Sequence, residues 1–321
     1  MKKPIFSIII ALHVMNDKFF EDLKRFKKLN FSSYEIIIIT DKHVNFFLKN
    51  SQIRVVEPKK NIKLGEKRDL GYRVSRGDYC AYIDDDAYPE KNWLRNAYKI
   101  FQSNNRIAAV GGPNVNPPHD PFWNNISGII LSSYLTTGEQ QYRFRPVRRY
   151  DDKELQGVNM IIKKSVLKKL GGFTNTFNYG DDTKIINDIR KLGYIAVSDP
   201  SVIVYHHRRI FPFAHLRQIY LMGKHRGYFV RKYPETSAPI YFLPVILAWG
   251  LVMAIVLFCV FSVLRLPIFG LFTIFYIAGV LSVFRYSKLL HALIAGLGII
   301  TTHLIYGVSF FFGYITKSMK Y

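Results

Sequence analysis

Two short clusters of aspartate carry most of the chemistry that this sequence could perform. The first cluster, Asp84-Asp85-Asp86, closes an apolar run at residues 79–83. Neighbouring carboxylates repel one another, so their full ionisation is favoured by a cation bound between them. A buried strand that delivers such a cluster at its carboxyl end matches the place where open α/β sheets bind ligands. The alternative interpretation is a solvated turn before Pro89.

The second cluster lies nearly a hundred residues further along the chain. Gly180 is followed by Asp181 and Asp182 at the start of a helical pattern. Aspartate is favoured as a helix N-cap, which would explain one of these carboxylates but not both. A carboxylate that faces a metal-binding cluster across a cleft suits a general base acting on a hydroxyl group.

The elements that position these clusters alternate between strand and helix patterns over the first 110 residues. Strands are expected at residues 5–12, 35–40, 52–57, 79–83 and 107–110, and helices at 18–29, 64–75 and 89–103. This alternation predicts an α/β fold with a mainly parallel sheet covered on both faces. Asp41 follows the second strand and should therefore share a sheet edge with the first aspartate cluster.

Regular patterns fade between residues 111 and 150, where prolines and a basic polar stretch predict a long active-site loop with some helix in it. Beyond the loop we expect a strand at 157–162, helices ending at Gly171-Gly172 and spanning 182–193, and a last strand at 196–205.

The charge distribution divides the chain near residue 235. The whole chain has a formal net charge of +22, yet residues 236–321 contain no acidic residue and carry three apolar stretches, at about 240–264, 266–284 and 289–315. Each stretch is near the ~20 residues of a membrane-spanning helix. The middle stretch is the shortest and follows Pro267, so a re-entrant segment is its alternative.

These patterns predict a catalytic domain at residues 1–210, an amphipathic interfacial helix at 211–235 and a transmembrane domain at 236–321. The first residues resemble a signal peptide but lack a small-residue cleavage site. We therefore expect a multi-pass membrane protein whose catalytic domain is cytoplasmic. The basic residues are dispersed without a recognition motif, so we expect membrane lipids and phosphorylated substrates as partners, and no nucleic acid.

In the order and spacing of its landmarks, the chain resembles the family-2 glycosyltransferases of GT-A fold (Rossmann-like) over residues 4–235. The landmarks are Ser7-Ile8-Ile9-Ile10, Asp41, Gly65, Lys67-Arg68-Asp69, Gly77-Asp78, Asp84-Asp85-Asp86, Pro89, Trp93-Leu94, Gly171-Gly172-Phe173, Gly180-Asp181-Asp182 and Tyr205-His206. Two positions depart from the family pattern. Asp69 stands where the family commonly has Asn, and Lys184 stands where an acidic residue often follows the second motif.

The resemblance implies a nucleotide-sugar donor, with a UDP-sugar favoured, and assigns residues to it. Asp41, Arg68, Asp84 and Asp85 would bind the nucleotide sugar. Asp84 and Asp86 match the two aspartates of the DXD motif, and Asp86 would hold Mg²⁺ or Mn²⁺ on the diphosphate.

The resemblance also implies an inverting reaction in which Asp182 deprotonates the acceptor hydroxyl and Asp181 lies beside it. His206 would complete the metal site, although a surface histidine at a strand end is the alternative. Trp93 is expected to pack within its helix rather than stack on a sugar.

The C-terminal part contains Arg209, Leu216-Arg217-Gln218, Gly223 and Arg226, followed by a proline and the three apolar stretches. In this pattern it resembles a membrane-attached branch that includes the succinoglycan and other exopolysaccharide glucosyltransferases, which extend sugars on polyprenyl-diphosphate carriers. By this resemblance Arg209, Gln218 and Arg226 would meet a polyprenyl-phosphate-linked or other glycan acceptor. Arginine pairs well with phosphate oxygens, but plain anchoring to anionic headgroups would use the same residues.

Two other function classes stay open. Another metal-dependent enzyme of nucleotide diphosphates, such as a nucleotidyltransferase, would usually have a Gly-rich loop after the first strand, whereas this chain has Ala11-Leu12-His13-Val14. A non-enzymatic basic membrane scaffold would leave both aspartate clusters unexplained.

Overall fold

The chain folds into two compact units, each built from two separate stretches of sequence. The computed structural model describes residues 3–13, 15–40, 52–151, 155–173 and 180–317. The sheet unit comprises Met1–Pro117 and Arg145–His207, and the helical unit comprises Pro118–Phe144 and Arg208–Tyr321. The predicted nucleotide-binding residue Asp41 lies outside the described residues.

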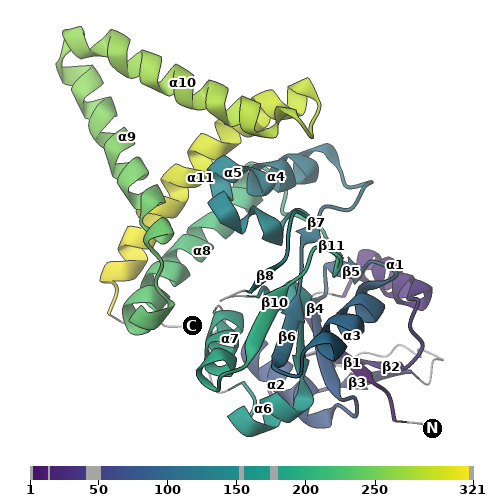
Figure 1. Cartoon of the computed structure of the whole chain (residues 1–321). Helices are drawn as coiled ribbons and strands as arrows, with labels where there is room; N and C mark the ends of the chain where they lie inside the picture. The colour runs from purple at the N-terminus through teal and green to yellow at the C-terminus, as the bar shows by residue number, and fades with distance from the viewer. Residues whose placement is uncertain (1–2, 14, 41–51, 152–154, 174–179, 318–321) are drawn as a thin grey trace. The chain divides into compact units, whose positions relative to one another are not determined.

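An eight-stranded sheet forms the centre of the sheet unit, in the order β3-β2-β1-β4-β9-β6-β10-β8 (Figure 1). Its strands are β1 (Phe6–Leu12), β2 (Tyr34–Thr40), β3 (Ile53–Val56), β4 (Tyr79–Asp84), β6 (Ile107–Gly111), β8 (Tyr150–Asp151), β9 (Met160–Lys163) and β10 (Ile195–Ser198). Strands β8 and β9 run antiparallel to their neighbours, and the other pairs are parallel. The expectation of a mainly parallel sheet is therefore confirmed.

Helices cover both faces of this sheet, which explains why its central strands read as continuous apolar runs. Ile8 and Ile10 of β1 belong to a core cluster with residues of α1 (Asp17–Arg25) and α3 (Trp93–Ser103). Ile9 belongs to a second cluster with residues of α2, α6 and α7. These three helices span Leu64–Val74, Lys164–Leu170 and Asp181–Lys191. Side chains alternate between the two faces of a strand, so β1 contributes to both clusters.

A second, three-stranded sheet has the order β5-β11-β7, formed by Ala87–Pro89, Val204–His206 and Asn114–Val115. The single strand expected at 196–205 is wrong, because the chain turns between β10 and β11. Pro200 has no N–H for a strand ladder. The carboxylate of Asp199 accepts hydrogen bonds from the backbone N–H and hydroxyl of Ser201, at 3.0 and 2.6 Å. This turn carries the chain from the large sheet into the small one.

The helical unit contains α4 (Phe122–Ser132), α5 (Tyr134–Thr137), α8 (Phe213–Lys232), α9 (Leu243–Val260), α10 (Arg265–Phe284) and α11 (Leu289–Ile315). Short 3₁₀ helices lie at Phe26–Lys28, Gly138–Arg143, Gly157–Asn159, Pro234–Thr236, Pro239–Tyr241 and Ser262–Leu264.

The compact units differ from the boundaries expected at residues 210 and 235. Much of the stretch expected to be an active-site loop belongs to the helical unit. Ile126 and Ile130 lie on one face of α4 and pack with Val283, Ala292 and Ala295 from α10 and α11. This contact is between segments far apart in sequence, so hydropathy along the chain does not reveal it.

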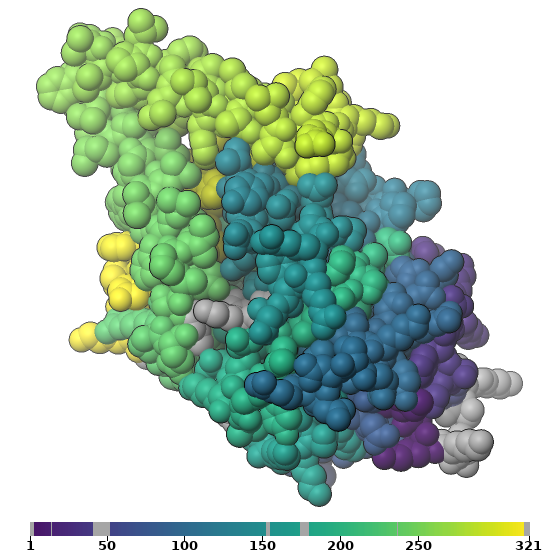
Figure 2. Space-filling model, in the orientation of Figure 1, coloured from purple at the N-terminus to yellow at the C-terminus, as the bar shows by residue number. Residues whose placement is uncertain are grey.

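Three helices are long and apolar enough to cross a membrane by length and composition. They span Pro239–Val260, Ser262–Phe284 and Leu289–Ile315, with 22, 23 and 27 residues. Figure 2 shows α9 and α10, in green, with their side chains at the surface, where many large apolar residues are exposed. Such all-round apolar surfaces are typical of helices in contact with lipid.

Candidate active site

A metal-compatible group of side chains lies where β4 ends. Asp84, Asp86 and His206 each offer one ligand atom, and these atoms all lie within 4.8 Å of one another. His206 Nε2 is 3.1 Å from Asp86 Oδ1. The antiparallel pairing of β5 and β11 sets His206 opposite Ala87, directly after the aspartate cluster. The pairing of β5 with β11 thus places His206 beside the two aspartates with which the sequence analysis grouped it.

The donor set of this group fits a hard divalent cation. Two carboxylates supply the oxygen ligands that Mg²⁺ and Mn²⁺ favour, and the imidazole of His206 adds a nitrogen ligand. Burial raises the pKa of the Asp84 carboxyl, Arg68 opposes this rise, and the nearby Asp86 adds to it. A cation at this position would relieve the repulsion between the carboxylates.

Asp85 has a different environment from its two neighbours. Its Oδ2 accepts a hydrogen bond of 2.6 Å from the backbone N–H of His13, which follows β1. The central aspartate therefore fastens the chain after β1 to the end of β4.

Arg68 connects the two aspartate clusters. Its guanidinium donates to Asp181 Oδ2 at 2.6 Å and to Asp84 Oδ1 at 3.1 Å, and the residue is only 4% exposed. Burial disfavours the charged guanidinium, but Asp181, Asp84 and Asp182 together raise the pKa of Arg68 above its usual value. The carboxylate of Asp84, the last residue of β4, and that of Asp181, the first residue of α7, are therefore held by one cationic side chain of the protein itself.

The chain segment before β9 completes this arrangement. Gly157 lies against the guanidinium of Arg68, and a Cβ atom at this position would overlap it. The Gly157 N–H also donates to Asp182 Oδ2 at 3.0 Å. Gly157 was not recognised as a site residue from the sequence. Its only signal in the sequence is a glycine directly before the mainly apolar stretch at residues 158–162.

The two aspartates at the start of α7 have distinct surroundings. Gly180, with φ of 82°, is the N-cap of α7, so neither aspartate has the capping role considered above. Asp181 is 2% exposed, and its burial raises the pKa of its carboxyl while Arg68 opposes the rise. Asp182 is partly exposed, and its Oδ1 accepts the Thr183 N–H at 2.7 Å. Asp182 is thus the aspartate of this pair that a substrate can reach more easily.

Two landmarks of the sequence have structural roles. Trp93 is fully buried, and its Nε1–H donates to Asn159 Oδ1 at 2.9 Å, in accord with the packing role expected. Asp69, which replaces the common Asn, accepts hydrogen bonds from Arg73 at 2.6 Å and from the Phe173 N–H at 3.0 Å. The carboxylate therefore ties α2 to the segment after α6.

The predicted acceptor residues all belong to the helical unit. Arg209 is exposed and precedes α8, while Gln218 and Arg226 lie on it. Eight residues separate Gln218 from Arg226, which is about 12 Å along a helix axis. The guanidinium of Arg226 lies over the ring of Tyr241 at 4.9 Å.

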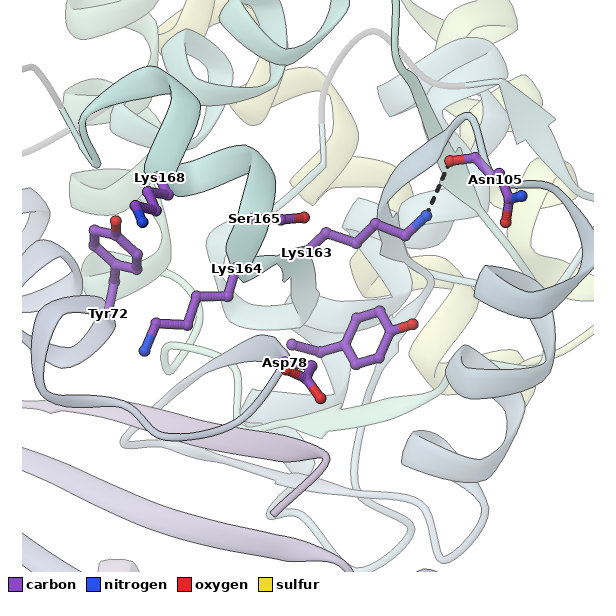
Figure 3. A pocket seen from close by; sticks show the side chains of 8 residues that line it. Tyr72, Asp78, Asn105, Lys163, Lys164, Ser165 and Lys168 are labelled. Carbon is purple, nitrogen blue, oxygen red and sulfur yellow. Dashed lines mark hydrogen bonds between the residues drawn. The ribbon is translucent and has the colours of Figure 1, made fainter. Parts of the chain in front are cut away.

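A cavity of about 580 Å³ lies at the other end of β4 and is lined by Asp78, Tyr79 and three lysines, among other residues (Figure 3). One of these lysines, Lys163, donates to the carbonyl of Asn105 at 3.0 Å. The strand from Tyr79 to Asp84 would be about 17 Å long at the usual rise per residue. This basic cavity is therefore separate from the carboxylate group.

Comparison with known proteins gives consistent results. Residues 17–171 match the family described as Glycosyl transferase family 2. An uncharacterized glycosyltransferase of Methanocaldococcus jannaschii is 22% identical over 182 residues, which is 53% of this chain and 59% of that protein. The glucosyl-dolichyl phosphate glucuronosyltransferase of Haloferax volcanii is 27% identical over 131 residues, 38% of each chain. The chain thus matches about three fifths and two fifths of the lengths of these relatives.

Solved structures share the fold at low sequence identity. The mannosyltransferase PcManGT from Pyrobaculum calidifontis, in complex with GDP-Man and Mn²⁺, is 17% identical with a TM-score of 0.58, covering 98% of this chain and 87% of that chain. GalNAc-T7 with UDP, GalNAc and Mn²⁺ is 16% identical with a TM-score of 0.51, covering 74% and 51%. The mainly parallel sheet and these structural neighbours show a GT-A fold, and residues 17–171 of the chain match glycosyl transferase family 2.

Proposed function

We propose that this protein is an inverting, metal-dependent glycosyltransferase that moves a sugar from a nucleotide-sugar donor to a lipid-linked or other membrane-proximal glycan. The observation that carries the proposal is the convergence of Asp84, Asp86 and His206 within 4.8 Å at the carboxyl end of β4. A group of this kind suits a diphosphate with its cation, because open α/β sheets bind ligands at this edge.

Asp84, Asp86 and His206 would hold Mg²⁺ or Mn²⁺. A bound cation supplies charge neutralisation at the diphosphate leaving group. The Mn²⁺ complexes of the mannosyltransferase and of GalNAc-T7 support this assignment. For the donor we propose a UDP-sugar, with Asp41 at the nucleobase, and a GDP-sugar as the second class to test because the mannosyltransferase is complexed with GDP-Man.

Asp182 would act as the general base. The N–H groups of Gly157 and Thr183 orient its carboxylate. As the acceptor oxygen attacks the anomeric carbon, its proton passes to an Asp182 oxygen and the nucleoside diphosphate departs from the opposite face. Such attack inverts the anomeric configuration. General-base assistance of this type accelerates reactions by roughly 10²–10⁴-fold. Arg68 and Asp181 would fix the surroundings of this base rather than exchange protons.

The acceptor would be a glycan on a polyprenyl phosphate. Three helices with the length and composition of membrane spans favour a multi-pass protein whose acceptor is held at the bilayer. The name of the Haloferax volcanii relative, which includes a dolichyl phosphate, supports a lipid carrier. Arg209, Gln218 and Arg226 would contact the carrier phosphate or its first sugar, and the catalytic domain would be cytoplasmic.

The purified full chain, in detergent, should be incubated with a panel of UDP- and GDP-sugars and polyprenyl-phosphate-linked acceptors, with and without Mn²⁺. We expect nucleoside diphosphate release and sugar transfer that both require the metal. Formation of a nucleotide sugar and pyrophosphate from a sugar phosphate and a nucleoside triphosphate would instead identify a nucleotidyltransferase. A complete lack of turnover with every donor, alongside retained binding to anionic vesicles, would favour a scaffold.

A further inference from the structure

A buried hydrogen-bonded pair, Asp22 and His207, lies next to the proposed metal group and has no role in the chemistry described so far. Asp22 of α1 is 4% exposed, although it shares a helix face with the buried Phe19 and Leu23. The Nε2–H of His207 donates to Asp22 Oδ2 at 3.0 Å. A carboxylate on an otherwise apolar face is costly unless it is paired, and Asp22 has two partners, since Arg25 Nε also lies 3.5 Å from its Oδ1.

His207 is fixed to the metal group through its backbone as well. It directly follows β11, whose last residue is His206. The backbone N–H of His207 donates to the carbonyl of Asp86 at 3.0 Å. One residue therefore touches the main chain of one proposed ligand and is covalently joined to the other, while its side chain is held by Asp22.

Aromatic packing joins the same elements. The guanidinium of Arg25, on α1, lies 4.3 Å from the ring centroid of Tyr88 on β5. Tyr88 stacks on Tyr205 of β11 with ring centroids 4.9 Å apart. These contacts place α1 firmly against the small sheet. The hydrogen bond between His207 and Asp22 joins the same two elements next to the ligand atoms.

We propose that Asp22 and His207 form a positioning pair that keeps Asp86 and His206 at the distance a shared cation requires. This inference rests on the proposed metal site. Neither member of the pair would contact the cation. Without the pair, β11 would keep its ladders with β5 and β7 and the backbone bond from His207 to Asp86, but the His207 side chain would no longer anchor the strand end to α1, and His206 could drift from Asp86. Residues that orient the ligands of a metal without touching it typically account for about 10–100-fold in metal affinity.

The test is Mn²⁺ binding by the full chain in detergent with nucleoside diphosphate present, followed through the electron paramagnetic resonance signal of free Mn²⁺. Asp22→Leu and His207→Leu remove the hydrogen bond while filling the space. Asp22→Asn and His207→Gln keep an acceptor or a donor and serve as conservative rescues. Glu35→Gln is the matched control, because Glu35 is a buried carboxylate that accepts from Ser7 at 2.7 Å and Arg76 at 2.9 Å near the start of β2.

We expect the Mn²⁺ dissociation constant to rise about tenfold or more in both leucine variants. The rise should be smaller in the Asn and Gln variants and absent in Glu35→Gln, even where that control melts earlier. Wild-type affinity in the leucine variants, or equal weakening in the control, would overturn the positioning role. If the wild-type chain binds no Mn²⁺ under these conditions, the proposed metal site itself fails, and the positioning role fails with it. If the wild type binds Mn²⁺ and the leucine variants bind it equally well, the metal site stands and only the positioning role of Asp22 and His207 is refuted.

Discussion

Arg68 is the residue through which the two aspartate clusters meet. Its planar guanidinium reaches Asp181 and Asp84 with separate N–H groups, a fork geometry that lysine cannot reproduce. Removing one member of a buried ion pair leaves an uncompensated charge, which commonly destabilises a protein by about 3–5 kcal/mol. Asp181 is therefore a structural partner of Arg68, and Asp182 is the residue to test for proton transfer.

Asp182→Asn should lower the turnover number by roughly 100-fold or more, because an amide cannot take up the acceptor proton. Donor binding should persist, since the carboxylates of Asp84 and Asp86 are unchanged. Steady-state kinetics with a saturating donor and nucleotide-binding titrations would measure the two effects separately.

Asp188→Asn is the matched control for this substitution. Asp188 lies on the same helix, α7, and forms an ion pair with Lys184. Its substitution therefore removes the same charge from α7 without removing a partner of Arg68. Asp181→Asn should act differently from both, by lowering the melting temperature and weakening donor binding. Near-normal turnover of Asp182→Asn, or an equal loss in Asp188→Asn, would disprove the general-base role.

At the scale of elements, the sequence predicted the large sheet well because its strands are local apolar runs that end at recognisable polar residues. It did not predict the small sheet. Strands β5 and β11 have three residues each and lie more than a hundred positions apart, so no local sequence pattern indicates that they pair. His206 could therefore be assigned to the proposed metal site only through family resemblance, and no pattern in the sequence connects Asp22 with His207.

The contact between α8 and α11 depends on small residues. A Cβ at Gly227 would overlap the backbone of α11 at Phe310, whereas a Cβ at Gly250 on α9 would meet nothing within 4 Å. Close approach of this kind is typical of helices packed in membranes. Gly227→Leu should therefore overpack the interface and lower the free energy of unfolding by about 1–3 kcal/mol, so the melting temperature should fall by several degrees. Gly250→Leu is the control, and equal melting temperatures for the two variants would contradict this packing.

The same unit contains a histidine whose protonation should affect stability. His215 of α8 is fully buried, with Nδ1 2.6 Å from the Ser127 hydroxyl and Nε2 3.0 Å from the Thr302 hydroxyl. Burial, helped by the charge of Arg208, lowers the pKa of His215 to about 4. The unfolded chain would take up this proton near pH 6.5.

Between these two pKa values the unfolded state binds more protons than the folded state, so the stability should decrease as the pH falls. The contribution of His215 is complete above about pH 6.5, and about 3 kcal/mol of it is lost by pH 4. Melting temperatures in detergent between pH 7.5 and pH 4.5 would measure this loss. His215→Gln, which carries no titrating group, should show a weaker dependence on pH. Parallel curves for the variant and the wild type would show that His215 does not titrate in this way.

At the scale of the whole molecule, hydropathy predicted the three apolar helices but not the composition of the unit that contains them. Residues 118–144 belong to the helical unit, although their prolines and polar residues indicated a loop of the catalytic domain. Their helix α4 has only one apolar face, and the partner of that face lies some 150 residues later, at Val283 and Ala292. A partner this distant in sequence can be recognised only from the structure.

The central claim is that the carboxyl end of β4 binds a nucleoside diphosphate together with a divalent cation. The most direct measurement is calorimetric titration of UDP and GDP into the full chain, with and without Mn²⁺, for the wild type, Asp86→Ala and Asp78→Ala. Asp78 is the control because its ion pair with Lys3 lies at the opposite end of the strand. We predict that one nucleotide binds at least tenfold more tightly with Mn²⁺, and that Asp86→Ala but not Asp78→Ala abolishes this gain. Equal nucleotide affinity with and without Mn²⁺, or an undiminished gain in affinity from Mn²⁺ in Asp86→Ala, would contradict the account.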